Sequence, residues 1–187
     1  MLIFLGRVAN QLFQGYLKPS TITKTKAGAL SYDVSFRCWP MDLDAFMHMN
    51  NAMYVRVAEL ARWRIFVQSG TLSLTSLRGI LFLAVEQHVQ YLRPIRPLQR
   101  FVVRTAVSAR EDKWVHYTHT FLAAAAGGAE EVLAVVKCKA VLKERDGRTV
   151  YVSSVAQQSP FYRQMLEEAS GSSTASTTSN TSRVEEA

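Results

Sequence analysis

Acidic residues are absent from the first 32 positions of the chain, where the only charged side chains are positive: Arg7, Lys18, Lys24 and Lys26. Cysteine is scarce as well, because Cys38 and Cys138 are too few for a disulfide framework and lie in strand-like stretches that suit buried thiols. No apolar run approaches the roughly 20 residues that a membrane-spanning helix needs. No internal repeat or glycine-rich phosphate loop is present. We therefore expect a soluble folded body without disulfide bonds.

The remaining composition describes one domain. The chain has 187 residues, of which 48% are hydrophobic and 20% charged, enough for one buried core with extensions at both ends. The formal charge of +7 favours an anionic partner, such as nucleic acid, an acidic membrane surface or coenzyme A. Charge alone does not choose among these partners. Because aromatic and basic residues are not interleaved as in nucleic-acid platforms, we expect no nucleic-acid partner.

The two ends differ in composition from the middle. Residues 1–30 form a basic leader whose hydroxyl-rich, acid-free composition suits a mitochondrial presequence. The helical spacing of its apolar residues equally favours a segment on a membrane surface or a helix packed against the domain: Leu5, Val8, Leu12 and Tyr16. We expect a mitochondrial protein, with cytoplasmic or membrane-associated locations as the alternatives. Residues 170–187 are rich in Ser and Thr and predict a disordered tail.

Residues 31–169 read as one α+β domain that ends in a C-terminal helix. Alternating apolar residues predict a strand over residues 31–39, and an apolar stripe predicts a five-turn helix over residues 52–69. Further strands are predicted over residues 79–92, 98–109, 113–125, 131–143 and 149–153. Trp114, Tyr117 and Phe121 are expected in the sheet interior. This order predicts an antiparallel β-sheet wrapped around one long central helix.

The polar residues best suited to catalysis precede that helix. Two carboxylates, an imidazole and two carboxamides fall within ten positions: Asp42, Asp44, His48, Asn50 and Asn51. Asn50 or Asn51 suits the helix N-cap, and the free amides and positive dipole end of the helix suit a carbonyl oxygen that gains negative charge. A simple Asx-type turn without chemistry is the alternative for the two aspartates, and a bracing imidazole is the alternative for His48.

The pattern Asp44-x3-His48-x-Asn50-Asn51-x2-Tyr54-x4-Glu59-x2-Arg62 resembles hotdog-fold thioesterases of the 4-hydroxybenzoyl-CoA and acyl-carrier-protein type. It is most similar to the branch called thioesterase superfamily member six. The resemblance covers residues 32–153 and includes Tyr91-Leu92-Arg93-Pro94-Ile95. It implies the hotdog fold and hydrolysis of a fatty-acyl or aryl-acyl thioester.

By position, the resemblance implies that Asp44 is the nucleophile or the general base toward the thioester. It also implies that the Asn51 amide polarises the thioester carbonyl and that His48 is a catalytic residue. We assign substrate contacts to a second group: Asn50, Tyr54, Glu59 and Phe46. Two features depart from the family: Phe46 replaces an asparagine of the plant enzymes, and the turn at Arg110-Glu111-Asp112-Lys113 is too acidic for strong pyrophosphate binding. We expect no metal site and no cofactor other than the coenzyme A carried by the substrate.

Less specific interpretations stay open beside these. Glu59 suits an ion pair with Arg56 or Arg62, three residues away on the helix. A non-catalytic acyl-binding or structural subunit of a larger assembly is the alternative function. By analogy with hotdog proteins we expect at least a homodimer, acting on an acyl-CoA or acyl-carrier-protein thioester. The enzymatic interpretation assumes that Asp44 and the first turn of the long helix meet in one tunnel.

Overall fold

The computed structural model describes residues 2–17, 21–24, 30–72, 79–110, 112–124, 129–157 and 163. The elements follow the order α1 (Leu2–Leu17), β1 (Thr21–Lys24), β2 (Leu30–Arg37), the 3-10 turn η1 (Pro40–Asp42), α2 (Asn51–Gln68), β3 (Leu81–Tyr91), β4 (Arg100–Arg110), β5 (Trp114–Ala124), β6 (Glu130–Lys143), β7 (Thr149–Val150) and α4 (Val152–Ala156). The predicted tail over residues 170–187 lies outside the described residues.

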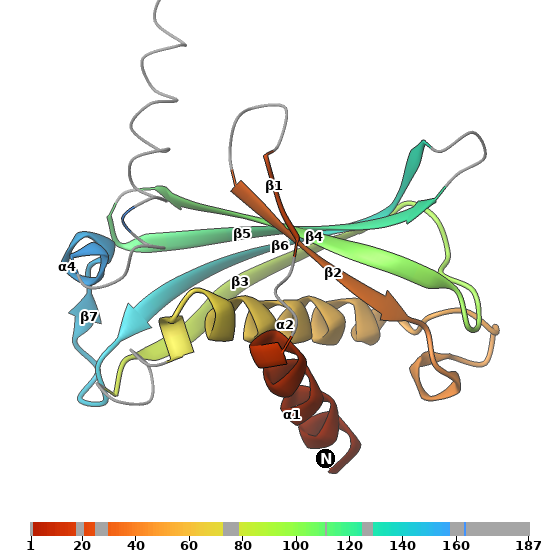
Figure 1. Cartoon of the computed structure of the whole chain (residues 1–187), viewed down its shortest axis with the longest axis horizontal. Coiled ribbons are helices and arrows are strands. Elements are labelled where there is room, and N and C mark those ends of the chain that lie inside the picture. Colours follow the sequence, from red (N-terminus) through yellow and green to blue (C-terminus); the bar gives the residue numbers. More distant parts are fainter. Residues whose placement is uncertain are drawn as a thin grey trace, which may run out of the picture.

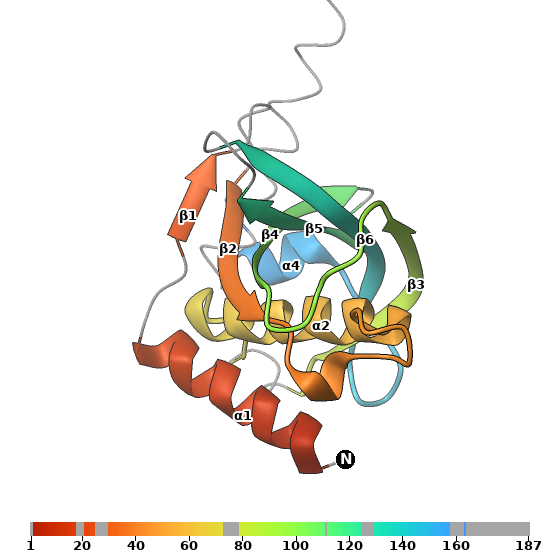
Figure 2. The ribbon, with the colours of Figure 1, turned by 90° about the vertical axis from the view of Figure 1, so that its right-hand side faces the viewer.

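A single antiparallel sheet curves over the long helix α2 (Figures 1 and 2). The strands lie in the order β1-β2-β4-β5-β6-β3, and the short strand β7 pairs with β6. Among the described strands, β3 therefore forms one edge of the sheet, although it is the next described strand after α2 in the chain. This is the α+β arrangement predicted from the sequence, a sheet wrapped around one central helix.

Helix α2 packs closely against the sheet because its inner positions are small or apolar. Ala58 and Ala61 are fully buried, which lets the helix axis approach the strands. Aromatic residues fill the space on either side: Tyr54 lies 5.3 Å from Phe121 between ring centroids, and Phe66 lies 5.4 Å from Phe82. The core thus holds both the start and the end of α2 in fixed positions.

Strand β5 shows how the alternation of side chains separates the inner face from the outer face. Tyr117, His119 and Phe121 are buried against α2. The prediction for Trp114 was wrong: its ring is only partly buried and has Lys113 Nζ at 4.7 Å and Lys139 Nζ at 4.3 Å from its centroid. A tryptophan at the start of a strand is compatible with either face, and here the two lysines stabilise it on the outside.

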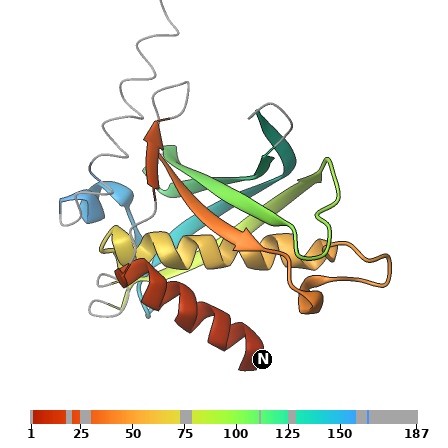
Figure 3. The ribbon, with the colours of Figure 1, turned by 45° about the vertical axis from the view of Figure 1, so that its right-hand side comes forward.

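The leader contributes two elements that are joined to the domain. Helix α1 crosses the outer side of α2 (Figure 3), and β1, which was not predicted, pairs with β2. At the crossing, Gly15 is so close to α2 that a Cβ atom there would lie 3.3 Å from the Arg64 carbonyl oxygen. Gln68 Nε2 donates a hydrogen bond of 3.3 Å to the Gly15 carbonyl. The mitochondrial role of the leader stays a prediction.

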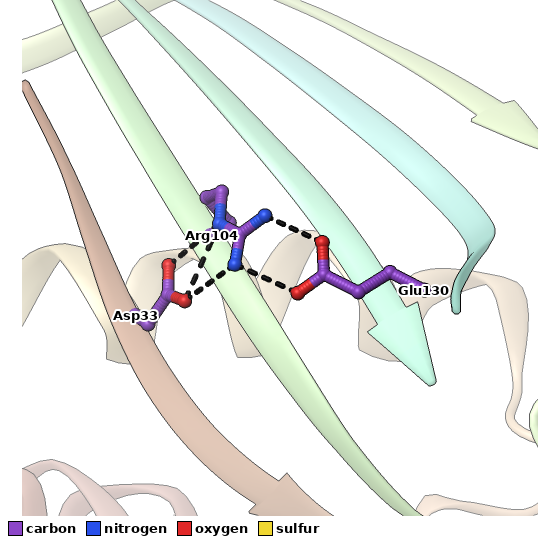
Figure 4. A network of polar contacts seen from close by, with 3 residues as sticks. All are labelled: Asp33, Arg104 and Glu130. Carbon is purple, nitrogen blue, oxygen red and sulfur yellow. Dashed lines mark hydrogen bonds and ion pairs between the residues drawn. The ribbon is translucent and has the colours of Figure 1, made fainter. Parts of the chain in front are cut away.

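A charged network ties strands together on the outer face of the sheet (Figure 4). Arg104 on β4 donates to both carboxylate oxygens of Asp33 on β2 and to both of Glu130 at the start of β6. The hydrogen bonds from Arg104 lower the pKa of Glu130, and both carboxylates raise the pKa of Arg104. Two bidentate pairs on one guanidinium fix the positions of β2, β4 and β6 relative to one another more firmly than isolated surface pairs do.

The end of the domain differs from the prediction in one respect. The last strand stops at Val150, and Val152 begins the short helix α4 instead. Asp112 explains this change, because its carboxylate accepts hydrogen bonds of 2.6 Å from both the amide and the hydroxyl of Ser153. Asp112 is one of the two acids in the turn that we judged unsuitable for binding pyrophosphate. In the structure it anchors α4.

Candidate active site

The loop between β2 and α2 is built around the buried side chain of Asp42. This carboxylate is 0% exposed, accepts a hydrogen bond of 2.9 Å from the Trp39 amide and pairs with Arg7 of α1. Its backbone carbonyl accepts a hydrogen bond of 2.8 Å from the Asn50 amide. Asp42 thus connects α1, the loop and the start of α2. Sequence reasoning missed Arg7, since its contact with Asp42 joins residues 35 positions apart.

Asp44 and His48 lie together in a tight turn within this loop. The Asp44 amide donates to the His48 carbonyl at 3.0 Å, and His48 Nδ1 lies 3.3 Å from Asp44 Oδ2. The other oxygen of Asp44 accepts a hydrogen bond of 2.9 Å from the Phe46 amide, which is the Asx-type turn considered above. The side chains of Asp44 and His48 are 21% and 38% exposed. The turn therefore presents an oriented carboxylate and imidazole that solvent reaches.

The start of α2 adds a hydrogen-bond donor next to this turn. Asn50 is the N-cap, and its side-chain oxygen accepts from the Ala52 amide at 2.9 Å. The Asn51 amide has no hydrogen-bond acceptor among the described residues. A free amide in the first turn of a five-turn helix, at the positive end of its dipole, is suited to bind a developing oxyanion.

Tyr91, at the end of β3, brings the free edge of the sheet to the same place. Its hydroxyl donates a hydrogen bond of 3.1 Å to the Asn51 carbonyl. Its ring lies edge-on to Tyr54, 5.1 Å away between centroids. Burial raises the pKa of Tyr54, which lies in the core below the first turn. The start of α2 is therefore held from beneath by Tyr54 and adjoins the edge strand.

Of two further predicted substrate contacts, Phe46 lies at this centre and Glu59 does not. Phe46 is 81% exposed and stacks on His48 with 6.0 Å between ring centroids. Glu59 lies eight residues after Asn51, which is about 12 Å along the helix. Of the two ion pairs considered for Glu59, the one with Arg62 does not occur among the described residues, whereas the one with Arg56 stays a prediction. The structure thus brings together Asp44, His48, Asn50 and Asn51, but not Glu59.

Three large cavities on the described residues were compared with the expected tunnel. Their volumes are about 510, 520 and 720 Å³, and none is lined by Asp44, His48 or Asn51. The first lies on the outer face of the sheet, and the second lies between α2 and β3. The third lies between α1 and β2 and reaches the loop at Trp39 and Met41. None of the three is the expected tunnel, and the exposure of the Asp44 and His48 side chains shows that solvent reaches the site in a single copy of the chain.

The buried thiols are poor candidates for chemistry. Burial, followed by the charge of Asp42, raises the pKa of the Cys38 thiol to about 11. Burial also raises the pKa of Cys138. Since the thiolate is the nucleophilic form, neither residue is activated at neutral pH. Within the described part of the chain, no group of three candidate metal ligands is found and no helix is long and apolar enough to span a membrane.

A sequence model of the thioesterase-like superfamily matches residues 38–169, which include the whole of this loop and α2. The chain belongs to the thioesterase-like superfamily. Protein THEM6 of Xenopus laevis is 32% identical over 84 residues, which make up 45% of this chain and 41% of that relative. The match thus spans less than half of the curated relative's length.

Solved structures of thioesterases share the fold. The probable thioesterase YbaW of Escherichia coli superposes with a TM-score of 0.60 at 18% identity, covering 73% of this chain and 97% of YbaW. The 4-hydroxybenzoyl-CoA thioesterase of Pseudomonas superposes with a TM-score of 0.58 at 18% identity, covering 65% of this chain and 93% of that enzyme. The predicted hotdog fold is therefore confirmed.

Proposed function

We propose that the chain is a thioester hydrolase in which Asp44 activates water and the Asn51 amide stabilises the oxyanion. The observation that carries this proposal is the contact of 3.3 Å between Asp44 and His48, beside the free amide that begins α2. Membership of the thioesterase-like superfamily supports the same chemistry. The alternative, a subunit that kept the fold without the chemistry, draws support from the openness of the site.

The reaction needs few groups. Asp44 removes a proton from water, and the resulting hydroxide attacks the thioester carbon. The carbonyl oxygen becomes negative and binds to the Asn51 amide, whose position at the helix terminus is fixed before the reaction starts. The carbon–sulfur bond then breaks. A thiolate is a good leaving group because thiols have pKa values of about 8.5, so its departure depends little on a general acid.

The cavity of about 720 Å³ favours coenzyme A over a carrier protein as the leaving thiol. It is lined by Arg7, Arg37 and Arg100, and it includes Trp39 from the same loop as Asp44. Guanidinium groups bind phosphates in a bidentate manner, and an exposed indole ring offers a face for stacking. These arginines supply positive charge that the acidic turn before β5 lacks.

A second copy of the chain is the partner that the edge strand favours. Strand β3 has eleven residues, pairs only with β6 among the described strands, and exposes Leu81, Leu83 and Val85. A long apolar edge of this kind is a template for pairing with another strand. Because Tyr91 of this strand contacts the start of α2, a dimer formed here would close the open side of the site.

Hydrolysis of a panel of acyl-CoA and acyl-carrier-protein substrates tests this function. We expect turnover of acyl-CoA, a loss of kcat of at least about a hundredfold in Asp44→Asn, and unchanged kcat in Asp146→Asn, which alters an exposed turn. Arg100→Met should raise KM for acyl-CoA and leave kcat unchanged. Equal rates in the wild-type protein and Asp44→Asn would reject the enzymatic role and favour the structural subunit.

A further inference from the structure

Arg62, in the middle of α2, is a buried cation with one guanidinium nitrogen that lacks a hydrogen-bond partner. Its side chain is 6% exposed, and its Nη1 atom is buried without any hydrogen-bond acceptor. No carboxylate among the described residues lies within ion-pairing distance of it, and its closest compensation is the ring of Phe82, 5.4 Å from the guanidinium carbon. A buried charge without a counterion is costly, so its presence asks for an explanation.

The buried histidine next to Arg62 provides no negative charge. His119 is fully buried, and its Nδ1 atom shares a hydrogen bond of 2.8 Å with the Thr105 hydroxyl. Burial, followed by the nearby Arg62 charge, lowers the pKa of His119 well below 6.5, so the imidazole is neutral at physiological pH. The Nε2 atom of His119 is also buried without a partner. The neutral His119 ring therefore does not balance the positive charge of Arg62.

Arg62 forms part of the wall of a cavity of about 520 Å³ between α2 and β3, within the usual size range of small-ligand pockets. Most of this wall is apolar: Trp63, Phe66, Leu72, Ile80, Phe82 and Leu83. Glu59 and Gln87 are the other polar residues in the wall. Among the described residues, the cavity therefore offers a long apolar surface, one cation at Arg62 and one acid at Glu59.

We propose that this cavity binds a fatty carboxylate, with the carboxylate on the Arg62 guanidinium and the hydrocarbon chain against the apolar wall. A planar carboxylate matches the two-pronged geometry of a guanidinium. Beside Glu59, a carboxylate adds one negative charge to the cavity, whereas a phosphate dianion would add two. The site is separate from the loop that holds Asp44, since none of the residues of that loop lines the cavity.

Binding is measured by isothermal titration calorimetry of the full chain with decanoate and with its neutral methyl ester. The wild-type protein should prefer decanoate, and Arg62→Met should lose roughly ten- to a hundredfold of the affinity for decanoate without losing affinity for the ester. Arg56→Met is the matched control, because Arg56 lies on the same helix but is exposed and does not line the cavity.

Glu59→Gln provides an independent check in the opposite direction. Removing the only acid in the cavity wall should tighten decanoate binding several-fold and leave binding of the ester unchanged. Asp44→Asn should bind decanoate like the wild-type protein, so a failure of the hydrolytic function and a failure of this site are distinguishable. Thermal melting of each variant confirms that it is folded. Equal affinity for decanoate and its ester, or no binding of either, would overturn the proposal.

Discussion

At the scale of single residues, two aspartates only two positions apart have different environments. Asp42 is fully buried and paired with Arg7, whereas Asp44 lies partly in solvent beside His48. A buried, paired carboxylate has its hydrogen-bonding capacity occupied, so it holds the loop together. A partly exposed carboxylate can still accept a proton from water. The chemistry is therefore expected at Asp44 and the structural role at Asp42.

His119 makes the stability of the protein depend on pH. Its pKa is lowered in the folded state, so below about pH 6.5 the unfolded chain binds a proton that the folded chain does not. The free energy of unfolding should therefore fall as the pH decreases from 7 to 5, by up to about 1.4 kcal/mol for each pH unit. Urea denaturation of the wild-type protein at pH 7, 6 and 5 measures this slope.

His119→Gln should remove most of that pH dependence, because glutamine can still bond to Thr105 but does not titrate. His116→Gln is the control. His116 lies on the same strand, is only partly buried and lines the cavity on the outer face of the sheet. If His119→Gln and the wild-type protein show the same slope, the neutral buried imidazole is not its cause.

Some residues of the site could be predicted from the sequence and others could not. Asn50 and Asn51 were placed at the helix start because capping depends on local spacing, and that placement is confirmed. Arg62 was considered as one of two ion-pair partners of Glu59, since i,i+3 spacing on a helix favours such pairs. Its burial depends on the distant residues Phe82 and His119, so no local pattern could reveal it.

At the scale of elements, α1 is an integral layer of the structure rather than a separate extension. It covers α2 at Gly15 and provides the cation for Asp42. The spacing of its apolar residues left packing, membrane contact and targeting equally open, because an amphipathic helix suits all three. Contacts with the domain favour packing: Val8 of the predicted stripe packs against the core, and Gly15 contacts Gln68 of α2, a pair that no hydrophobic pattern includes.

Gly15→Leu tests the importance of that crossing. A larger side chain would meet the Arg64 backbone, so it should push α1 away and reduce the free energy of unfolding by about 1–3 kcal/mol. Gly6→Leu, on the same helix, has nothing within 4 Å of the added Cβ and should be neutral or slightly stabilising. Equal effects of the two substitutions in urea denaturation would contradict close packing of α1 on α2.

The long elements were predicted within one or two residues at most ends, whereas the short ones were not. The helix predicted over residues 52–69 spans Asn51–Gln68. By contrast, β1 was missed and the last strand was extended too far, since both depend on partners. Strand β1 has four residues and is defined by its pairing with β2, and the last strand is ended by the contact of Asp112 with Ser153.

At the scale of the whole molecule, the proposed dimer accounts for the openness of the site. Sedimentation velocity should show a dimer for the wild-type protein and a monomer for Leu83→Lys, because a charge on the free edge of β3 prevents strand pairing. Leu98→Lys changes another exposed leucine, in the turn before β4, and should remain dimeric. A monomeric wild-type protein would remove this explanation for how the site is enclosed.

The central claim is that a thioester carbonyl binds at the start of α2, within reach of Asp44. A crystal structure with a non-hydrolysable acyl-CoA analogue measures this directly, through the distance from the Asn51 amide nitrogen to the carbonyl oxygen. We expect roughly 2.7–3.1 Å, with the Asp44 carboxylate facing the same carbon. An analogue bound elsewhere, with the Asn51 amide still in contact with solvent, would contradict the claim.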